Sequence, residues 1–283
     1  MPLISIITIN FNNKTGLEKT FLSVFHQTVC DFEYIVIDGN STDGSKETIA
    51  ENATKINYWV SEKDSGIYNA MNKGITAAKG KYLLFLNSGD ALADNNVLEK
   101  VMLNIQDEAY SFYFGNLYLS KNNVRTQIWV PHHELSFCVF VSSTLPHPAC
   151  FIRKDLFDKY GFYNTKNKIV SDWEFFFMTI CRYNESYKKI EIVVSDFDLS
   201  GISSNKNHSA IINMERNEAL QKHFPLLKNE IYFLEKIQNK RLQQIAIIQK
   251  NKLAWKILKA FIKFLLLFMK EKPQQVIGKI SKL

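Results

Sequence analysis

The sequence lacks the features of a small disulfide-stapled fold or an exported protein. It has only four cysteines in 283 residues, and none of them forms a C-x-x-C pair, so neither a zinc site nor a disulfide framework is indicated. The first residues, MPLISIITINF, carry no basic segment, and their apolar run stops at Asn10, unlike a signal peptide. These absences predict a cytoplasmic protein.

Two glycine-rich phosphate-binding patterns are also missing. The chain has no G-x-G-x-x-G after its first apolar segment and no G-x-x-x-x-G-K-[ST] anywhere, so neither a dinucleotide-binding fold nor a P-loop is indicated. A membrane-spanning helix needs about 20 apolar residues, but within the apolar segment 252–270 the longest lysine-free stretch is 264–269. The sequence therefore predicts no transmembrane span in this segment.

Acidic residues are scarce at one end of the chain only. The formal net charge is +7, but residues 236–283 hold 12 Lys and Arg against one Glu, which leaves 23 basic and 27 acidic residues in the rest. The body is thus mildly acidic, and it shows no basic surface interleaved with aromatic residues. We expect no nucleic-acid partner.

Apolar segments at 4–9, 33–37, 57–60 and 82–86 alternate with helical patterns, one of which we expect Asp64 and Ser65 to cap. This alternation predicts right-handed βαβ units and a mainly parallel sheet flanked by helices. The pattern then becomes mixed, with strands at 112–119, 124–130, 149–152 and 190–194, helices at 97–105 and 154–160, and a helix that begins at SDW and runs through 174–183. We expect one α/β domain over residues 1–210 and a helical extension over residues 211–283.

Three aspartates follow the buried strands of the first half. Asp38 follows EYIVI, Asp64 comes just after NYWVSEK, and Asp90 ends the stretch YLLFLNSGD. Under a parallel topology they share the carboxyl edge of the sheet, where open α/β proteins bind ligands. Clustered carboxylates repel one another unless a cation or a set of hydrogen-bond donors shares the space. Asp90 is therefore a candidate ligand for Mg²⁺ or Mn²⁺, although N-S-G-D is also an ordinary turn sequence.

These motifs together resemble a family 2 glycosyltransferase of the GT-A fold, of the kind that acts in bacterial polysaccharide biosynthesis. The resemblance spans roughly residues 3–205. It rests on SIITINFN, FEYIVIDGNSTDGS, SEKDSGIYNAMNKGITAAKGKYLLFLNSGD, and SDWEFF followed by SGISS. It implies that residues 1–210 are a catalytic domain with a Rossmann-like sheet that binds a nucleoside-diphosphate sugar.

The resemblance also implies roles on the donor side. Thr8, Asn10 and Asp38 would border the nucleobase and ribose, with Asp38 accepting a hydrogen bond from the base, and Asp64 would lie near the nucleotide. Asp90 would be the remaining acid of the family's D-x-D motif and would bind the metal with the diphosphate. This chain departs from the motif, because Asn87 and Ser88 stand where an acid is common.

Asp172, in SDWEFF, matches the acid that acts as general base in inverting transfer. A sugar hydroxyl is a poor nucleophile, so a carboxylate must remove its proton during attack. Glu174 is the nearest alternative base. Asp172 could instead cap a helix, since acids are common before apolar helical runs.

On the acceptor side, His147 in LPHPACF resembles a family histidine, and Trp173 is a second candidate. A loop histidine can equally serve a structural hydrogen bond, and Trp173 sits in an aromatic run that is more often core. Ser203, in SGISS, could close over the phosphates, although a mobile turn is the ordinary interpretation.

The tail segment KLAWKILKAFIKFLLLFMK places Lys252, Lys256, Lys259 and Lys263 on one face of a helix, with apolar residues over the rest. This pattern predicts a helix of about residues 252–270 that lies in the plane of an anionic membrane. The same helix could instead pack on the catalytic domain or in a homodimer.

The sequence thus predicts a metal-dependent, inverting, hexosyltransferase-like enzyme, peripheral on the cytoplasmic face of the membrane. Its acceptor would be a glycan or a lipid-linked sugar. Two alternatives remain open: a sugar nucleotidyltransferase, although ITINFNNKTG is no glycine-rich basic loop, and a non-catalytic membrane-docking protein with a vestigial sugar site.

Overall fold

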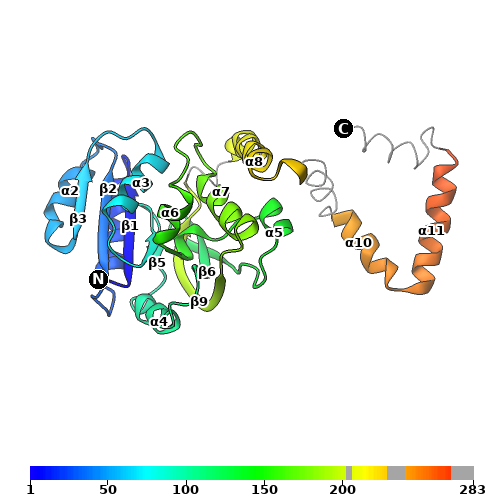
Figure 1. Ribbon diagram of the computed structural model, residues 1–283, viewed down its shortest axis with the longest axis horizontal. Helices are drawn as coiled ribbons and strands as arrows, with labels where there is room; N and C mark the ends of the chain where they lie inside the picture. The colour runs from blue at the N-terminus through cyan, green and yellow to red at the C-terminus, as the bar shows by residue number, and fades with distance from the viewer. Residues whose placement is uncertain (202–205, 228–239, 269–283) are drawn as a thin grey trace. The chain divides into compact units, whose positions relative to one another are not determined.

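A computed structural model describes residues 1–201, 206–227 and 240–268 (Figure 1). The chain divides into two compact units, one of residues 1–137 and 144–219 and the other of residues 138–143 and 220–283. The first unit holds the sheet and all the strand-end aspartates. In the described residues of the second unit lie α10 (Lys240–Gln249) and α11 (Lys252–Leu266).

A nine-stranded sheet forms the first unit, in the order β3-β2-β1-β4-β8-β6-β9-β5 with β7 paired to β6. Its parallel half consists of β1 (Ile4–Asn10), β2 (Glu33–Asp38), β3 (Tyr58–Ser61) and β4 (Tyr82–Phe85). The other strands are β5 (Ala91–Leu92), β6 (Phe112–Lys121), β7 (Val124–Trp129), β8 (Cys150–Arg153) and β9 (Tyr187–Asp198). β8 runs antiparallel to both β4 and β6, whereas β6 and β9 are parallel. The predicted mixed α/β fold is confirmed.

Helices cover both faces of this sheet. The helices α1 (Lys14–Phe25), α2 (Ser45–Glu51) and α4 (Val97–Asn104) contribute to one buried cluster with the even-numbered residues of β1. On the other face lie α3 (Ile67–Ala77), α6 (Asp155–Tyr160) and α7 (Ser171–Phe177). α3 packs so closely that a Cβ on Gly74 would stand 2.5 Å from Ile7 Cγ2. The remaining helices are α5 (Phe137–Ser142) and α8 (Ser209–His223).

One local prediction was wrong, one is confirmed, and one predicted strand is longer in the structure. Asp64 and Ser65 do not cap α3: its N-cap is Gly66, without a side-chain cap, and Asp64 Oδ1 accepts the Gly66 N–H at 2.9 Å. The helix predicted to begin at SDW and to run through 174–183 is confirmed: α7 begins at Ser171 and continues as a π-helical turn, Met178–Arg182. The strand predicted at 190–194 is part of the much longer β9, because its pairing with β6 continues beyond the apolar run.

Candidate active site

The carboxyl edge of the parallel strands gathers polar side chains from neighbouring strands. In the sheet register Asn10 pairs with Asp38, and Asp38 pairs with Ser61. Asp38 is fully buried, and its carboxylate accepts four hydrogen bonds: from Asn10 Nδ2 (2.8 Å), Ser41 Oγ (2.6 Å), Ser41 N (2.9 Å) and Ser61 Oγ (2.7 Å). Burial alone would raise the pKa of Asp38, but these bonds outweigh it and hold the pKa below its usual value.

Asn10 and Thr8 lie at different depths in β1. Thr8 is fully buried; its hydroxyl donates to Leu86 O at 2.7 Å and lies 3.0 Å from Tyr34 Oη, so its side chain does not reach the edge. Asn10 is 4% exposed, and its Nδ2 must face the Asp38 carboxylate. Its Oδ1 therefore points elsewhere, and that buried oxygen has no hydrogen-bond partner in the described structure.

Asp64 lies at the same edge. Its Oδ2 comes within 2.7 Å of the place that a Cβ on Gly39 would occupy, directly after Asp38. A side chain at position 39 would therefore have to displace the Asp64 carboxylate. Asp64 is partly exposed, so it flanks the buried Asp38 on the solvent side of the β2 end.

Asp90 sits in a turn that α1 holds in place. Thr20 Oγ1 donates to Asp90 O at 2.7 Å, and Gly89, at φ +105°, donates its N–H to Gly16 O at 3.0 Å. The Asp90 side chain is 4% exposed, and its Oδ1 accepts the backbone N–H of Asp198 at 3.0 Å. Asp90 thus lies between the end of β4 and the end of β9, a strand from the second half of the chain.

The electrostatic environment of Asp90 disfavours a bare negative charge. Burial raises the pKa of Asp90 to about 7, and the charges of Asp198 and Asp196 also raise it; the Asp198 N–H and Lys19 act in the opposite direction. A hard divalent cation fits such a carboxylate, and a neutral oxygen lies in the same turn, because Asn87 Oδ1 is buried without a hydrogen-bond partner among the described residues.

Asp172 lies on the first turn of α7, with 21% of its side chain exposed. The N-cap of α7 is Val170, and no side chain caps the helix, so the alternative capping role of Asp172 was wrong. Tyr68 Oη donates to Asp172 Oδ1 at 2.8 Å, and His147 Nδ1 stands 3.7 Å from Asp172 Oδ2. The carboxylate is therefore oriented by two neutral side chains and keeps a solvent-accessible side.

His147 is buried between aromatic side chains. It is 9% exposed, stacks on Phe85 at 4.8 Å between ring centroids, and its Nε2 lies 3.1 Å from Tyr163 Oη. Burial lowers the pKa of His147 despite the nearby charge of Asp172, so the ring is neutral near pH 7. With its proton on Nδ1, the ring can donate toward Asp172 and accept from Tyr163.

The structure separates the remaining candidates. Glu174, the alternative base, is 6% exposed, and its Oε2 accepts from Asn167 Nδ2 at 2.8 Å. Trp173 is 2% exposed and stacks on Phe177, with the Arg216 guanidinium 4.8 Å from its ring, so it lies in the core rather than on an acceptor surface. Ser203 lies outside the described residues.

Sequence reasoning missed three residues of this edge: Tyr68, Tyr163 and Asp198. Tyr68 lies in the motif SEKDSGIYNAMNKGITAAKGKYLLFLNSGD. The spacing of residues in that motif does not predict that the Tyr68 side chain on α3 points toward α7. Asp198 stands in SDFDLSG, where the alternating acids were visible. Its position beside Asp90 depends on the pairing of β9 with the two-residue strand β5.

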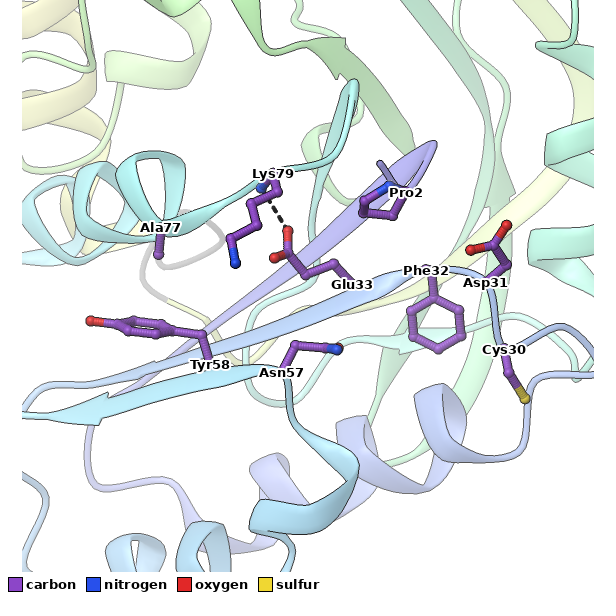
Figure 2. A pocket seen from close by; sticks show the side chains of 9 residues that line it. All are labelled: Pro2, Cys30, Asp31, Phe32, Glu33, Asn57, Tyr58, Ala77 and Lys79. Carbon is purple, nitrogen blue, oxygen red and sulfur yellow. Dashed lines mark hydrogen bonds between the residues drawn. The ribbon is translucent and has the colours of Figure 1, made fainter.

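A cavity of about 500 Å³ lies at the other edge of the sheet (Figure 2). It is lined by residues at the starts of β2 and β3 and near the end of α3, among them Glu33, Tyr58 and Lys79. Glu33 Oε2 accepts from Ser5 Oγ at 2.6 Å and from the Lys79 backbone N–H at 2.7 Å. Glu33 thus ties strand starts together, away from the aspartate edge.

The family model described as "Glycosyl transferase family 2" matches residues 5–187, and the chain belongs to this family. A "PGL/p-HBAD biosynthesis glycosyltransferase" of Mycobacterium bovis is 29% identical, over 72% of this chain and 80% of that protein. A "GalNAc(5)-diNAcBac-PP-undecaprenol beta-1,3-glucosyltransferase" of Campylobacter jejuni is 30% identical, over 43% of this chain and 40% of that protein.

Two solved structures share the fold. S. aureus TarS in complex with UDP-GlcNAc superposes with a TM-score of 0.61 at 16% identity, covering 88% of this chain and 79% of that chain. The mannosyltransferase PcManGT from Pyrobaculum calidifontis, in complex with GDP-Man and Mn²⁺, gives a TM-score of 0.57 at 15% identity, covering 99% and 84%. The GT-A fold predicted from the sequence is confirmed.

Proposed function

We propose that the protein is an inverting, hexosyltransferase-like glycosyltransferase that moves a sugar from a nucleoside-diphosphate donor to a glycan or lipid-linked acceptor in cell-surface glycan assembly. One observation carries the proposal: a partly exposed carboxylate, Asp172, oriented by Tyr68 and His147 at the ligand edge of a family 2 chain. The name of the Campylobacter jejuni relative, which includes PP-undecaprenol, supports an acceptor of lipid-linked type. Residues 1–210 would form the catalytic domain.

On the donor side we assign the base contact to Asn10 rather than Asp38. Four protein donors fill the Asp38 carboxylate, whereas Asn10 Oδ1 is an unmet acceptor beside it. A nucleobase N–H is a donor of the right kind for this oxygen. Asp38 then orients Asn10, and Asp64 lies at the partly exposed side of the nucleotide site.

Asp90 would hold Mg²⁺ or Mn²⁺ together with oxygens of the diphosphate. No group of three or more acidic, histidine or cysteine side chains converges as a metal cluster in the described residues. Oxygens of the diphosphate would be further ligands of the kind that these cations take. The bound ion supplies positive charge against the nucleoside diphosphate that leaves.

In the transfer step, Asp172 accepts the proton of the acceptor hydroxyl as its oxygen attacks the anomeric carbon. A new carbon–oxygen bond forms on one face of the sugar while the bond to the diphosphate breaks on the other, so the configuration inverts. Tyr68 donates to Oδ1, which keeps the carboxylate in one orientation for that proton.

The first test is a thermal-shift panel of nucleoside diphosphates and nucleotide sugars with Mn²⁺, Mg²⁺ or EDTA. A ligand at about 100 times its dissociation constant adds roughly 2.7 kcal/mol of stability. We expect one base to stabilise the protein in a metal-dependent manner, and transfer from that donor to give the inverted anomer by NMR. Retention of configuration would contradict the assigned mechanism.

The same panel separates the alternatives. A non-catalytic docking protein would bind the donor but transfer no sugar to any glycan or lipid acceptor. A sugar nucleotidyltransferase would instead release pyrophosphate from a nucleoside triphosphate and a sugar phosphate. Pyrophosphate release without glycosyl transfer would replace our proposal with the second alternative.

We further propose that α11 holds the enzyme on the cytoplasmic face of the membrane. Among the described residues, no helix is both long and apolar enough to cross a bilayer. On α11 the apolar residues Leu253, Ile257, Phe261 and Phe264 are 55–69% exposed, and the helical repeat puts the four lysines predicted from sequence on a separate face. An anionic surface satisfies both faces, because it accepts the apolar side chains and attracts the lysines.

Vesicle sedimentation tests this assignment. The full chain should bind vesicles that contain phosphatidylglycerol and release them at high salt, whereas a variant with glutamine at Lys252, Lys256, Lys259 and Lys263 should bind weakly. Equal binding by both proteins would contradict it. Loss of a dimer in the Phe261→Glu variant, without any vesicle binding by the wild type, would favour a homodimer contact instead.

A further inference from the structure

The end of β9 delivers a second carboxylate to the turn that contains Asp90. β5 pairs antiparallel with β9, with Ala91 opposite Asp196. The same register, continued two residues outward, places Asp198 opposite Gly89. The side-chain geometry agrees, because a Cβ on Gly89 would stand 3.3 Å from Asp198 Oδ2.

Glycine at position 89 is needed for this approach. Its φ of +105° lies in the region that favours glycine, and a side chain there would press against the Asp198 carboxylate. The backbone N–H of Asp198 donates to Asp90 Oδ1 at 3.0 Å, which joins segments 108 residues apart. The two acids are thus fixed next to each other by backbone contacts.

Each of the two carboxylates has one oxygen engaged. Asp90 Oδ1 accepts from Asp198 N, and Asp198 Oδ1 accepts from Ser200 N at 2.9 Å. In the part of the chain that the structure describes, neither Oδ2 receives a hydrogen bond, and neither acid forms an ion pair. Lys19 is the nearby cation, but its buried Nζ also lacks a hydrogen-bond partner there and contacts neither acid as an ion pair.

We propose that Asp198 is the second carboxylate ligand of the metal that Asp90 binds, and that it replaces the acid absent from positions 87 and 88. This inference rests on the proposed function. Two carboxylate oxygens without donors at one point repel each other, and a divalent cation with phosphate oxygens as its other ligands removes that repulsion. The metal site would then be divided between the turn after β4 and the end of β9.

The plain alternative is that Asp198 only closes the turn that follows β9, through its bond to the Ser200 N–H. The variant Asp198→Asn distinguishes these roles, because an asparagine oxygen still accepts that N–H but carries no charge. Asp198→Ser preserves the same turn with a hydroxyl and replaces Asp198→Asn if that variant melts abnormally. Glu191→Gln, on the same strand with the same change of charge, is the matched control.

The experiment measures Mn²⁺ binding to the full chain by electron paramagnetic resonance of the free ion, in the presence of the nucleoside diphosphate that gives the largest thermal shift. We expect Asp198→Asn to weaken Mn²⁺ binding at least about 10-fold, since even residues behind a ligand commonly change metal affinity 10- to 100-fold. Asp90→Asn should weaken it comparably, and Glu191→Gln should bind like the wild type.

Two results would overturn the inference in distinguishable ways. If Asp90→Asn loses Mn²⁺ but Asp198→Asn binds it normally, Asp198 is only a turn residue and the proposed function stands. If the wild type binds the nucleotide without any Mn²⁺ dependence, the metal dependence in the proposed function fails, and the role of Asp198 fails with it.

Discussion

Asp38 and Asp90 lie on the two sides of β1 at one edge of the sheet, and both are almost completely buried, yet their surroundings are opposite. Asp38 receives four hydrogen bonds and its pKa is lowered; Asp90 receives one on its side chain and its pKa is raised to about 7. The Asp38 carboxylate has donors for both of its oxygens. Among the described residues, no cation forms an ion pair with Asp90. We therefore propose a structural role for Asp38 and a ligand-binding role for Asp90, on the basis of the number of donors that each carboxylate receives.

A third acid, Asp172, can be compared with these two. Its substitution should have the largest effect on catalysis. Asp172→Asn should lower kcat about 10²- to 10⁴-fold, because a general base contributes an acceleration of this size. Donor binding, measured by thermal shift, should stay near that of the wild type. Glu174→Gln is the control: it should reduce stability but retain kcat. The reverse outcome, with Glu174→Gln inactive and Asp172→Asn active, would assign the base to Glu174.

Asp38→Asn should lower the stability of the protein. The amide offers one acceptor oxygen to donors that now share a carboxylate, so at least one buried donor is left without a partner. We expect a loss of about 3 kcal/mol in the free energy of unfolding, measured by urea denaturation. The lowered pKa of the wild-type Asp38 means that its contribution is present above the unfolded pKa and disappears as the pH falls. A change below 0.5 kcal/mol would show that the four bonds contribute little.

Asp90→Asn should act in the opposite sense. Because the folded pKa is raised, Asp90 favours folding below its unfolded pKa, and this contribution disappears as the pH rises through 7. In EDTA, we expect the wild type to lose roughly 2 kcal/mol between pH 5 and pH 8 through this group, and Asp90→Asn to be the more stable protein at pH 8.

The rate of sugar transfer by Asp90→Asn should be at least about 100-fold lower than that of the wild type, since metal ligation contributes several kcal/mol to such a step. Asp31→Asn, an exposed acid away from the ligand edge, controls for the change of charge. A folded Asp90→Asn protein with wild-type turnover would remove Asp90 from the metal site.

The smallest expected effect is that of Tyr68→Phe, which removes a hydrogen bond to Asp172. Tyr68→Phe removes one donor and should lower kcat about 10-fold, the value of roughly 1.4 kcal/mol. The KM for the acceptor should stay near that of the wild type, because Tyr68 orients the Asp172 carboxylate and does not bind the acceptor in the proposed mechanism. Tyr163→Phe, one step further away behind His147, should lower kcat less. Equal losses of kcat in the two variants would contradict the orienting role of Tyr68.

The sequence was sufficient to place the aspartates, because parallel strands must end at one edge whatever their neighbours are. It could not distinguish Asp38 from Asp90, since the donors to Asp38 come from Ser41 and from Ser61 on another strand. Both faces of β1 are buried, so no alternation showed that Thr8 points inward. Asp198 was out of reach for a different reason: the two-residue strand that brings it to Gly89 leaves no pattern in the sequence.

The hydrogen bond from Tyr68 to Asp172 connects residues that are 104 positions apart. Under the proposed function, Asp172 and Asp198 both follow residue 170, whereas Asn10, Asp38, Asp64 and Asp90 precede it. The site would therefore be complete only after β9 has paired with β5 and β6. A chain that ends at residue 170 would lack both the proposed base and part of the proposed metal site, however well its first strands form.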